Sequence, residues 1–592
     1  MAGWWCKVLR VDLSRNKVFE ERLELDLLKL FLGGTGLGAY WLYKHLKPGV
    51  EPLSEENIVV LASGPLTGSR VYGTSRIALI SKSPLTSTLF DSTCGGLFPM
   101  YFKRCGFDAV VIYGSSRKPV YIHIQDDKAE VLSAQDIWGI KVTETIQELR
   151  KRHGFNCSAI AIGPAGENLV RIASVMGDNG HAFGRGGLGS VFGSKKLKAI
   201  VASGTKPIEE AKSEELEMLL ENMRVRITWN PYLGRTLKSI GTNALLTVIN
   251  EWGLLPTMNF SKNMFEKADK LSGDELLKMV VGKKGCYNCP ISCKRVTKTD
   301  KMSGEGPEYE SVANLGSMLG VDDLNDVAEM NYLCNELGLD TISMGVTLAC
   351  FLELIEKGRI ELDLKWGEAD KLKELIIETA YRRGHGDEIA EGSLRLAKKY
   401  GEEKLSMSVK GLEIPAYDPR GAFGIALSYA TSYRGACHLR SWTIAFEIIG
   451  VPNLVDRFST FEKPALVKYT QDLASVYDSL VMCKHFAIEF DEEPLSAMLS
   501  AVTGIDFPKE ELLKVGERIW TVARLFNLRE GFSCKDDTLP ERLLTPLDGG
   551  PLAGKVPPIN DMIKEYYSVR GWSPEGVPTK DCIVRLGLEG VV

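Results

Sequence analysis

Short apolar runs separated by turn-forming residues dominate the chain from Cys6 to about Val201. The runs KVLRVDL, NIVVLASG, SRIALISK, DAVVIYG and KPVYIHIQ are rich in Val and Ile and are bounded by Gly, Pro, Ser or Asp. This pattern is typical of β-strands, and IQELRKRHG is the one helical interruption that we expect. Residues 1–205 are therefore predicted to form a β-rich domain.

After Lys206 the apolar positions recur with the 3.6-residue period of helices. The clearest examples are EELEMLLENMRVRI, DVAEMNYLCNELG, ADKLKELIIETAYRR and EELLKVGERIWTVARLF. A stretch rich in Gly and Pro near residues 412–424 predicts a boundary between two helical domains, residues 206–415 and 416–592. The predicted fold class is α+β, with a β-rich N-terminal base followed by two mainly α-helical domains.

Composition excludes several classes of protein. The 592 residues are 44% hydrophobic, and 77 acidic against 72 basic residues give a formal net charge of -5. Because no basic field is available to hold phosphate backbones, we expect no nucleic-acid partner. The apolar stretch from Ile342 to Ile355 contains Glu353 and is too short to span a bilayer, so it predicts a buried helix and no membrane span. The N-terminus has no signal-peptide pattern, which predicts a cytoplasmic protein.

Three of the 13 cysteines have the spacing of a metal site. Cys286, Cys289 and Cys293 form C-x2-C-x3-C, so three thiolates can converge from one loop on a small inorganic core. A fourth ligand has to come from elsewhere, and Cys483 in YDSLVMCKHF is the candidate. The spacing also fits a zinc site that closes a loop. A chain of this length needs no metal staple, which favours a cluster that carries electrons.

Glycine-rich loops supply candidate anion sites. GGTGLGA from Gly33 matches a dinucleotide fingerprint only loosely and fits a turn that opens a helix equally well. FGRGGLGSVFGSKKLKAI is more informative, because its glycines free backbone N–H groups beside Arg185 and a basic stretch. Arg76 in GTSRIALIS is a second fixed cation that could reach the same anion, although an exposed strand arginine is equally common.

Several motifs together resemble one enzyme family. KGCYNCPISCK, GPEYES, GLDTISMG, the region from Tyr417 to His438 and DSLVMCK occur in its order and spacing. The chain resembles the aldehyde:ferredoxin oxidoreductase family over nearly its whole length. The resemblance implies tungsten, or molybdenum as in some relatives, held by two pterin-dithiolene cofactors (a bis-pterin), with one 4Fe-4S cluster nearby. Mg²⁺ bridging the pterin phosphates is a further expectation.

The resemblance also assigns residues to the cluster and to the cofactor. It makes Cys286, Cys289, Cys293 and Cys483 the cluster ligands. The residues that it implies for cofactor binding are Arg76, Gly95, Arg185, Gly186, Asp340, Met344, Gly345, Arg440, Asp478 and Lys484.

Two aspartates begin the matching family motifs, DTISMG from Asp340 and DSLVMC from Asp478. A carboxylate can accept two hydrogen bonds from the amino-pyrimidine edge of a pterin, which fixes the orientation of the ring. Ser343 and Val481 replace motif glycines here, and Gly345 replaces a terminal acid, so the pterin contacts differ from the family pattern. Asp340 is also well placed to cap a helix that starts at TISMGVTLA.

Oxidation of an aldehyde to a carboxylate needs a proton acceptor and a donor that polarises the carbonyl. Glu310 in GEGPEYES matches the family position near the metal, with Glu308 and Glu305 as competitors. His438 and Tyr417 stand 21 residues apart, as in the formaldehyde-type branch of the family. The predicted catalytic residues are therefore Glu310, His438 and Tyr417.

These features lead to one functional hypothesis and two alternatives. The hypothesis is tungsten-dependent oxidation of an aldehyde, with electrons leaving through the cluster to ferredoxin or to a small iron-sulfur partner subunit. One alternative is the catalytic subunit of a complex that dearomatises an aryl-CoA thioester, and the other is a zinc-stabilised binding protein without turnover. The resemblance further implies a homodimer or a hetero-oligomer.

Overall fold

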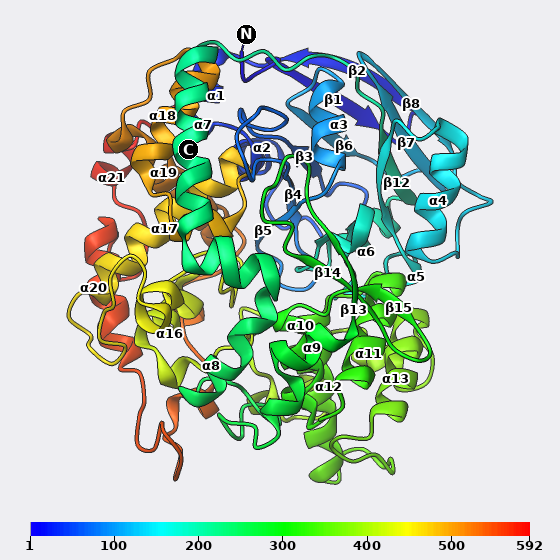
Figure 1. Ribbon diagram of the computed structural model, residues 1–592, viewed down its shortest axis with the longest axis vertical. Helices are drawn as coiled ribbons and strands as arrows, with labels where there is room; N and C mark the ends of the chain where they lie inside the picture. The colour runs from blue at the N-terminus through cyan, green and yellow to red at the C-terminus, as the bar shows by residue number, and fades with distance from the viewer. Residues whose placement is uncertain (1) are drawn as a thin grey trace.

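The computed structural model describes residues 2–592, which form a β-rich part and two groups of helices. In Figure 1 the blue and cyan strands of the N-terminal part lie at the top and upper right. Most green helices lie below them, whereas the green helix α7 (Ser213–Trp229) lies at the upper left, on the side of the yellow to red helices (Figure 1). The predicted α+β fold class is confirmed, while the division at residues 205 and 415 stays a prediction.

The first sheet has six strands in the order β2-β1-β6-β3-β4-β5. β1 and β6 pair in parallel, and the other neighbours are antiparallel. Every residue of β3 and β4 is buried, which explains why these strands read as unbroken apolar runs. The strands are β1 Lys7–Asp12, β2 Lys17–Arg22, β3 Val59–Ala62, β4 Ile77–Lys82, β5 Leu89–Cys94 and β6 Ala109–Tyr113.

The second sheet also has six strands, in the order β11-β10-β9-β12-β7-β8. Its central strands β9 and β12 are buried along their whole length, and β12 pairs with β7 in parallel. The strands are β7 Val120–Gln125, β8 Lys128–Ser133, β9 Ser158–Ile162, β10 Val175–Gly177, β11 Ala182–Phe183 and β12 Leu197–Ala202.

The expectation of a single helical interruption in the N-terminal part is wrong. Besides the expected α4 there are five more helices, and α2 carries the GGTGLGA motif. Its glycines serve close packing, because a Cβ on Gly36 would lie 2.2 Å from the Phe31 carbonyl oxygen. Glycine disfavours helix on propensity, so packing decides the structure here. The helices are α1 Leu25–Phe31, α2 Gly34–His45, α3 Phe98–Arg104, α4 Val142–His153, α5 Pro164–Glu167 and α6 Leu188–Ser194.

The middle part of the chain is helical with one small sheet. The apolar stretch from Ile342 lies in α12, where residues 342–352 are all buried, so the predicted core helix is confirmed. The helices are α7 Ser213–Trp229, α8 Leu245–Glu251, α9 Gly273–Met279, α10 Tyr309–Leu315, α11 Leu324–Leu337, α12 Thr341–Glu356, α13 Ala369–Tyr381, α14 Gly386–Ile389 and α15 Ser393–Lys399. The small sheet consists of β13 Val280–Lys284, β14 Lys294–Lys298 and β15 Ser303–Glu305.

The C-terminal part begins after a short hairpin and is built around one long central helix, α17. This helix packs against α19, α20 and the glycine-rich α2 of the first part. The hairpin strands are β16 Ser408–Val409 and β17 Leu412–Glu413. The helices are α16 Phe423–Thr431, α17 Lys463–Leu480, α18 Glu492–Thr503, α19 Lys509–Arg529, α20 Ile559–Arg570 and α21 Lys580–Arg585. Within residues 2–592, no helix has the length and apolarity that a membrane crossing requires.

Candidate functional site

The three closely spaced cysteines lie in the loop of residues 285–293, which connects β13 and β14. Cys293 directly precedes β14, and two hydrogen bonds connect the start of the loop to the backbone of Gly96, which follows strand β5. The Tyr287 N–H donates to the Gly96 carbonyl oxygen (3.2 Å), and the Gly96 N–H donates to the Cys286 Sγ (3.3 Å). The N-terminal part of the chain therefore fixes the position of the cysteine loop.

Cys483 follows α17 and lines the same cavity as the three loop cysteines. Its backbone N–H donates to the Gly73 carbonyl oxygen (2.9 Å), which fixes the segment on the first domain. We call this space of about 290 Å³ the cysteine cavity. The fold thus brings together the four predicted cluster ligands from positions far apart in the chain. Across the described residues, no three His, Cys, Asp or Glu side chains are close enough to hold a single metal ion.

Burial sets the protonation of these thiols. It raises the pKa of Cys289 to about 12, with the neighbouring Cys286 and Cys483 adding to the rise. Burial also raises the pKa of Cys293 well above its usual value, and it raises that of Cys483 against the opposing charge of Arg76. Since metals bind thiolates, loading iron onto these cysteines has to release protons.

Four cations line the cysteine cavity, Arg76, Lys294, Arg440 and Lys484, together with the carboxylates of Glu305, Glu308 and Asp478. The Arg76 guanidinium donates to the carbonyl and hydroxyl oxygens of Thr93, both at 3.0 Å. Gly95 lies between these groups, because a Cβ there would come within 2.8 Å of the Cys286 sulfur. The predicted residues Arg76, Gly95, Arg440, Asp478 and Lys484 therefore share one cavity with the four cysteines.

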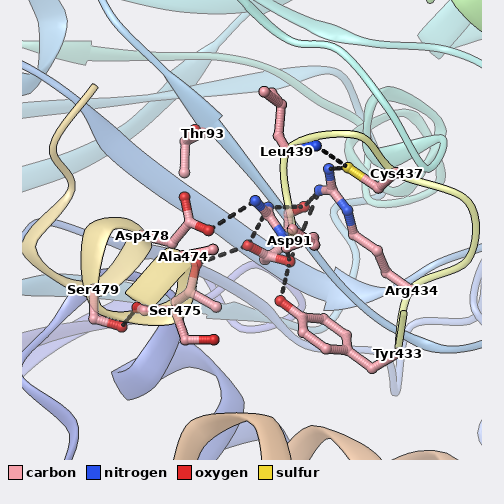
Figure 2. Close-up of polar contacts among 12 residues, drawn as sticks. Asp91, Thr93, Tyr433, Arg434, Cys437, Leu439, Ala474, Ser475, Asp478 and Ser479 are labelled. Carbon is pink, nitrogen blue, oxygen red and sulfur yellow. Dashed lines mark hydrogen bonds and ion pairs between the residues drawn. The ribbon is translucent and has the colours of Figure 1, made fainter. Parts of the chain in front are cut away.

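A buried polar network centred on Asp91 holds Arg440, which lines the cysteine cavity (Figure 2). The Asp91 carboxylate accepts hydrogen bonds from the Thr35 hydroxyl (2.8 Å), the Tyr433 hydroxyl (2.8 Å) and the Arg440 guanidinium (2.5 Å). Arg434 donates to the Asp91 carbonyl oxygen. Arg440 and Arg434 hold the pKa of Asp91 below its usual value, although burial acts in the opposite direction. Asp91 lies inside strand β5 without a motif around it, so the sequence gives no signal for its role.

The same network reaches the second motif aspartate. Arg440 donates to Asp478 at 2.7 Å, and the Lys484 ammonium lies 2.9 Å from the same carboxylate oxygen. Burial lowers the pKa of Lys484 to about 8. At the other end, Arg434 donates to the sulfur of Cys437 (2.8 Å), and arginines lower the pKa of that thiol although burial opposes them (Figure 2). Cys437 directly precedes His438, and sequence spacing gave no signal for it.

The predicted catalytic residues form a second group next to the cavity. The Glu310 Oε1 lies 3.5 Å from the His438 Nδ1, and neither atom has a hydrogen-bond partner in the structure. The other Glu310 oxygen accepts the backbone N–H of Ala416 (3.0 Å) and the amide of Asn314 (3.1 Å). The Tyr417 ring lies 5.8 Å from the His438 ring, between ring centroids.

Burial gives Glu310 and His438 unusual protonation. It raises the pKa of Glu310 to about 7, with backbone and side-chain hydrogen bonds limiting the rise. Burial, with Arg185, Arg434 and Arg440, lowers the pKa of His438 well below its usual value. At neutral pH the histidine is therefore neutral and the glutamate exchanges its proton readily.

The two competing glutamates have different surroundings. Glu308 lies 3.5 Å from the Lys294 ammonium, and Glu305 lies 2.5 Å from that of Lys284. Both line the cysteine cavity, whereas His438 faces Glu310. The neighbouring lysine lowers the pKa of Glu308. Glu310 is thus the glutamate whose pKa suits proton transfer near pH 7.

Five predicted cofactor-binding residues do not line the cysteine cavity: Arg185, Gly186, Asp340, Met344 and Gly345. Arg185 donates to the carbonyl oxygens of Ala436 (2.8 Å) and Glu413 (2.5 Å), so Arg76 and Arg185 do not meet at one cavity. Asp340 caps α12 by accepting the Ile342 N–H (3.1 Å) and lies 3.4 Å from Arg185.

The glycines of this group have packing roles. A Cβ on Gly345 would lie 2.1 Å from the Asn314 carbonyl oxygen, and one on Gly186 would lie 2.4 Å from the Phe90 ring. Met344 is fully buried. Their assignment to the cofactor stays a prediction.

Comparisons with known proteins identify the chain. The model of the N-terminal domain of aldehyde ferredoxin oxidoreductase matches residues 8–204, and the model of its domains 2 and 3 matches residues 218–588. Over 99% of both chains, the protein is 42% identical to the tungsten-containing aldehyde ferredoxin oxidoreductase of Pyrococcus furiosus and equally so to that of Thermococcus kodakarensis.

A solved structure shows the same fold. The active-site complex BamBC of benzoyl-coenzyme A reductase superimposes with a TM-score of 0.88, over 100% of this chain and 98% of that one, at 23% identity. The fold and the family matches define an oxidoreductase. The chain belongs to the aldehyde ferredoxin oxidoreductase family.

Proposed function

We propose that this protein oxidises aldehydes to carboxylic acids with a tungsten bis-pterin cofactor, and that electrons leave through a 4Fe-4S cluster. The acceptor would be ferredoxin or a small iron-sulfur partner subunit. The observation that carries the proposal is the meeting of the four cysteines with Arg440, Asp478 and Lys484 in one cavity. The Glu310–His438 pair lies on the segments next to it.

The residues fit the proposed groups. Four thiols lining one space suit an iron-sulfur cluster, and Arg76, which donates to the neutral oxygens of Thr93, suits a phosphate of a pterin cofactor. The Glu310 Oε1 and the His438 Nδ1 are buried without a hydrogen-bond partner, so each is available to a polar substrate, because buried polar groups are normally hydrogen-bonded. When bound, the tungsten centre would supply a two-electron acceptor. The Mg²⁺ ion expected from the resemblance stays a prediction.

The protein's own residues would handle the protons of the reaction. An aldehyde and water give a carboxylic acid, two electrons and two protons, so a base has to take up a proton beside the carbonyl. Glu310 fits this role, because its pKa of about 7 lets it accept and release a proton at neutral pH. Neutral His438 can donate a hydrogen bond to the carbonyl oxygen, and Tyr417 lies close enough to hold its ring in place.

The alternatives receive less support. The aryl-CoA reductase alternative rests on a structural likeness at 23% identity, which concerns the fold alone. The chain is 42% identical over its full length to enzymes named for aldehyde oxidation. We also propose a cytoplasmic location and assembly as a homodimer or a hetero-oligomer.

One experiment tests the proposal. The protein is purified without oxygen, its metals are measured, and aldehydes are screened for reduction of a viologen dye. We expect tungsten or molybdenum, about four irons, an absorbance shoulder near roughly 400 nm that dithionite bleaches, and dye reduction. One equivalent of zinc without tungsten or molybdenum would support the zinc-stabilised protein instead. Dye reduction by none of the aldehydes would favour the aryl-CoA alternative.

A further inference from the structure

One buried cysteine next to the site has no part in the proposed cluster or in the proposed proton transfer. Cys437 directly precedes His438, its side chain is fully buried, and it does not line the cysteine cavity. Most buried cysteines behave as small apolar groups with inert thiols. The sulfur of Cys437 differs from these, because it accepts hydrogen bonds from both Arg434 and Leu439 (Figure 2).

The bond from Leu439 closes a turn around His438. The Leu439 N–H donates to the Cys437 Sγ at 3.3 Å, so His438 is the middle residue of this turn. Asp, Asn, Ser and Thr close the same kind of turn when their side chains accept the N–H two residues later. The sulfur takes the place of that oxygen here, and it fixes the backbone from which the imidazole projects.

The bond from Arg434 fixes the sulfur itself. The Arg434 guanidinium donates to the sulfur at 2.8 Å and to the Asp91 carbonyl oxygen, and it lies 4.8 Å from the centroid of the Phe90 ring. Burial raises the pKa of the Cys437 thiol, but Arg434 and two further arginines outweigh burial and lower the pKa. An ionised sulfur is the better acceptor, so the arginines strengthen both hydrogen bonds.

The position of the His438 ring depends on this turn. Its Nδ1 lies 3.5 Å from the Glu310 Oε1, and neither atom has a hydrogen-bond partner. Since no hydrogen bond to Nδ1 holds the ring, its direction follows from the backbone and from packing against Tyr417. On the preceding side of the segment, the Arg185 guanidinium fixes the Ala436 carbonyl oxygen (2.8 Å). The turn closed by the sulfur is the contact that fixes the following side.

We infer that Cys437 is a positioning residue, whose sulfur holds His438 against Glu310. The inference rests on the proposed oxidation and adds to it a residue that touches neither substrate nor cofactor. A misplacement of about 1 Å in an active site can lower the rate by about 100-fold. Loss of the sulfur acceptor should therefore lower kcat and leave KM nearly unchanged, because His438 acts on the carbonyl group during the reaction.

The first test compares Cys437→Ala with Cys437→Ser, because only the serine keeps an acceptor atom. With acetaldehyde and a viologen dye, we expect Cys437→Ala to lower kcat by about tenfold or more and to change KM by less than about twofold. Cys437→Ser should keep kcat within about threefold of the wild type, because a hydroxyl closes the same turn.

Cys105→Ala is the control for the loss of a buried sulfur. Cys105 is fully buried outside the cysteine cavity, and its thiol donates to the Tyr101 carbonyl oxygen (3.3 Å) instead of accepting a backbone N–H. Its kcat should equal that of the wild type. Equal losses of kcat in the two Cys437 variants, or the same loss in the control, would overturn the inference.

Crystal structures separate this inference from the proposed oxidation, because they need no turnover. The separation of the Glu310 Oε1 and the His438 Nδ1 is compared between the tungsten-loaded wild-type protein and Cys437→Ala. We expect it to grow by about 1 Å or more, which would support the positioning role even if no aldehyde is oxidised. An unmoved His438 in Cys437→Ala would overturn the role.

Should Cys437→Ala fail to fold, the structure of Cys437→Ser decides. A serine hydroxyl that accepts the Leu439 N–H, with His438 in its wild-type place, supports the inference. A broken contact to Leu439 with His438 still in place would overturn it, because the ring would then not need the turn.

Discussion

Glu310 has a pKa suited to proton transfer because its surroundings leave one oxygen unpaired. The backbone N–H of Ala416 and the Asn314 amide stabilise the ionised form only partly, and burial outweighs them. His438 next to it stays neutral, because burial and then the surrounding arginines lower its pKa. A neutral donor and a base with a near-neutral pKa are thus set side by side.

Replacing Glu310 with Gln should lower kcat by about 100-fold or more, because the base is lost while the shape is kept. In the wild-type protein kcat should fall as the pH drops below about 7, since Glu310 becomes protonated. The pH profile of aldehyde oxidation measures both effects, with Glu266→Gln as a surface control. An unchanged acidic limb in the Gln variant would assign the titration to another group.

The same substitution should have the opposite effect on stability. The folded-state pKa of Glu310 is raised, so the folded state binds the proton more tightly and stability falls as the pH rises from about 4.5 to 7. Glu310→Gln removes this penalty and should raise Tm at pH 8 but not at pH 4. Thermal unfolding at the two pH values measures the difference. A Tm that rises equally at both would rule out the titration as its cause.

Replacing His438 with Asn should lower kcat by about 100-fold or more and leave tungsten and iron contents unchanged. His438 faces Glu310 and not the cysteines, so its loss removes a donor without removing a ligand. Metal analysis and dye reduction on the same sample check both parts, and His153→Asn serves as the control. Loss of tungsten from His438→Asn would show a cofactor-holding role instead.

At the residue scale the sequence identified the candidate ligand residues, but it did not identify the buried residues that hold them in place. The C-x2-C-x3-C spacing named three cysteines, and the family motifs named Cys483, which the fold places at the same cavity. No pattern named Asp91, since a buried aspartate inside a strand has no local signature, and its partners Tyr433 and Arg440 come from another domain. Such a network depends on contacts that exist only after folding.

Among the elements, α17 connects packing with the site. It carries Asp478 in its last turn and leads to Cys483. It approaches α19 so closely that a Cβ on Gly516 would lie 2.1 Å from the Asp472 carbonyl oxygen. Of these two helices, α19 was indicated by the helical periodicity of its sequence, EELLKVGERIWTVARLF. The close crossing of α17 and α19 was not indicated by the sequence. An isolated glycine such as Gly516 in a helical pattern weakens the prediction of a helix and does not by itself indicate a packing contact.

Gly516→Ala should destabilise the protein by about 1–3 kcal/mol, because the added methyl group forces α17 and α19 apart. Thermal unfolding measures this, with Gly549→Ala as the control, since a Cβ there meets nothing within 4 Å. We also expect weaker iron retention, because α17 positions the segment of Cys483. A Tm equal to that of the control would show that the helices can separate without cost.

At the scale of the whole molecule, three parts of the chain meet at the cysteine cavity. Gly73 and Gly96 come from the first part, the cysteine loop from the second and Cys483 from the third. The sequence indicated the β-rich base and the helical remainder, because periodicity reports local structure. It could not indicate the meeting of the parts, which depends on packing between residues hundreds of positions apart.

Cys483→Ser should remove most of the absorbance near roughly 400 nm and lower Tm of the whole protein, because a cluster bound only to the folded state stabilises it. Cys534→Ser, at a cysteine outside the cysteine cavity, should do neither. Iron content and unfolding scans measure both. Full iron with an unchanged Tm would remove Cys483 from the ligand set.

The two main-chain bonds from Gly73 and Gly96 have a consequence for how the enzyme matures. Both halves of the thiol set are anchored by main-chain hydrogen bonds to loops of the first sheet, at Gly73 between β3 and β4 (2.9 Å) and at Gly96 after β5 (3.2 Å). Assembly of the inorganic core can therefore follow completion of the fold instead of driving it. A chain made in cells starved of iron should accumulate in a compact form that accepts iron later.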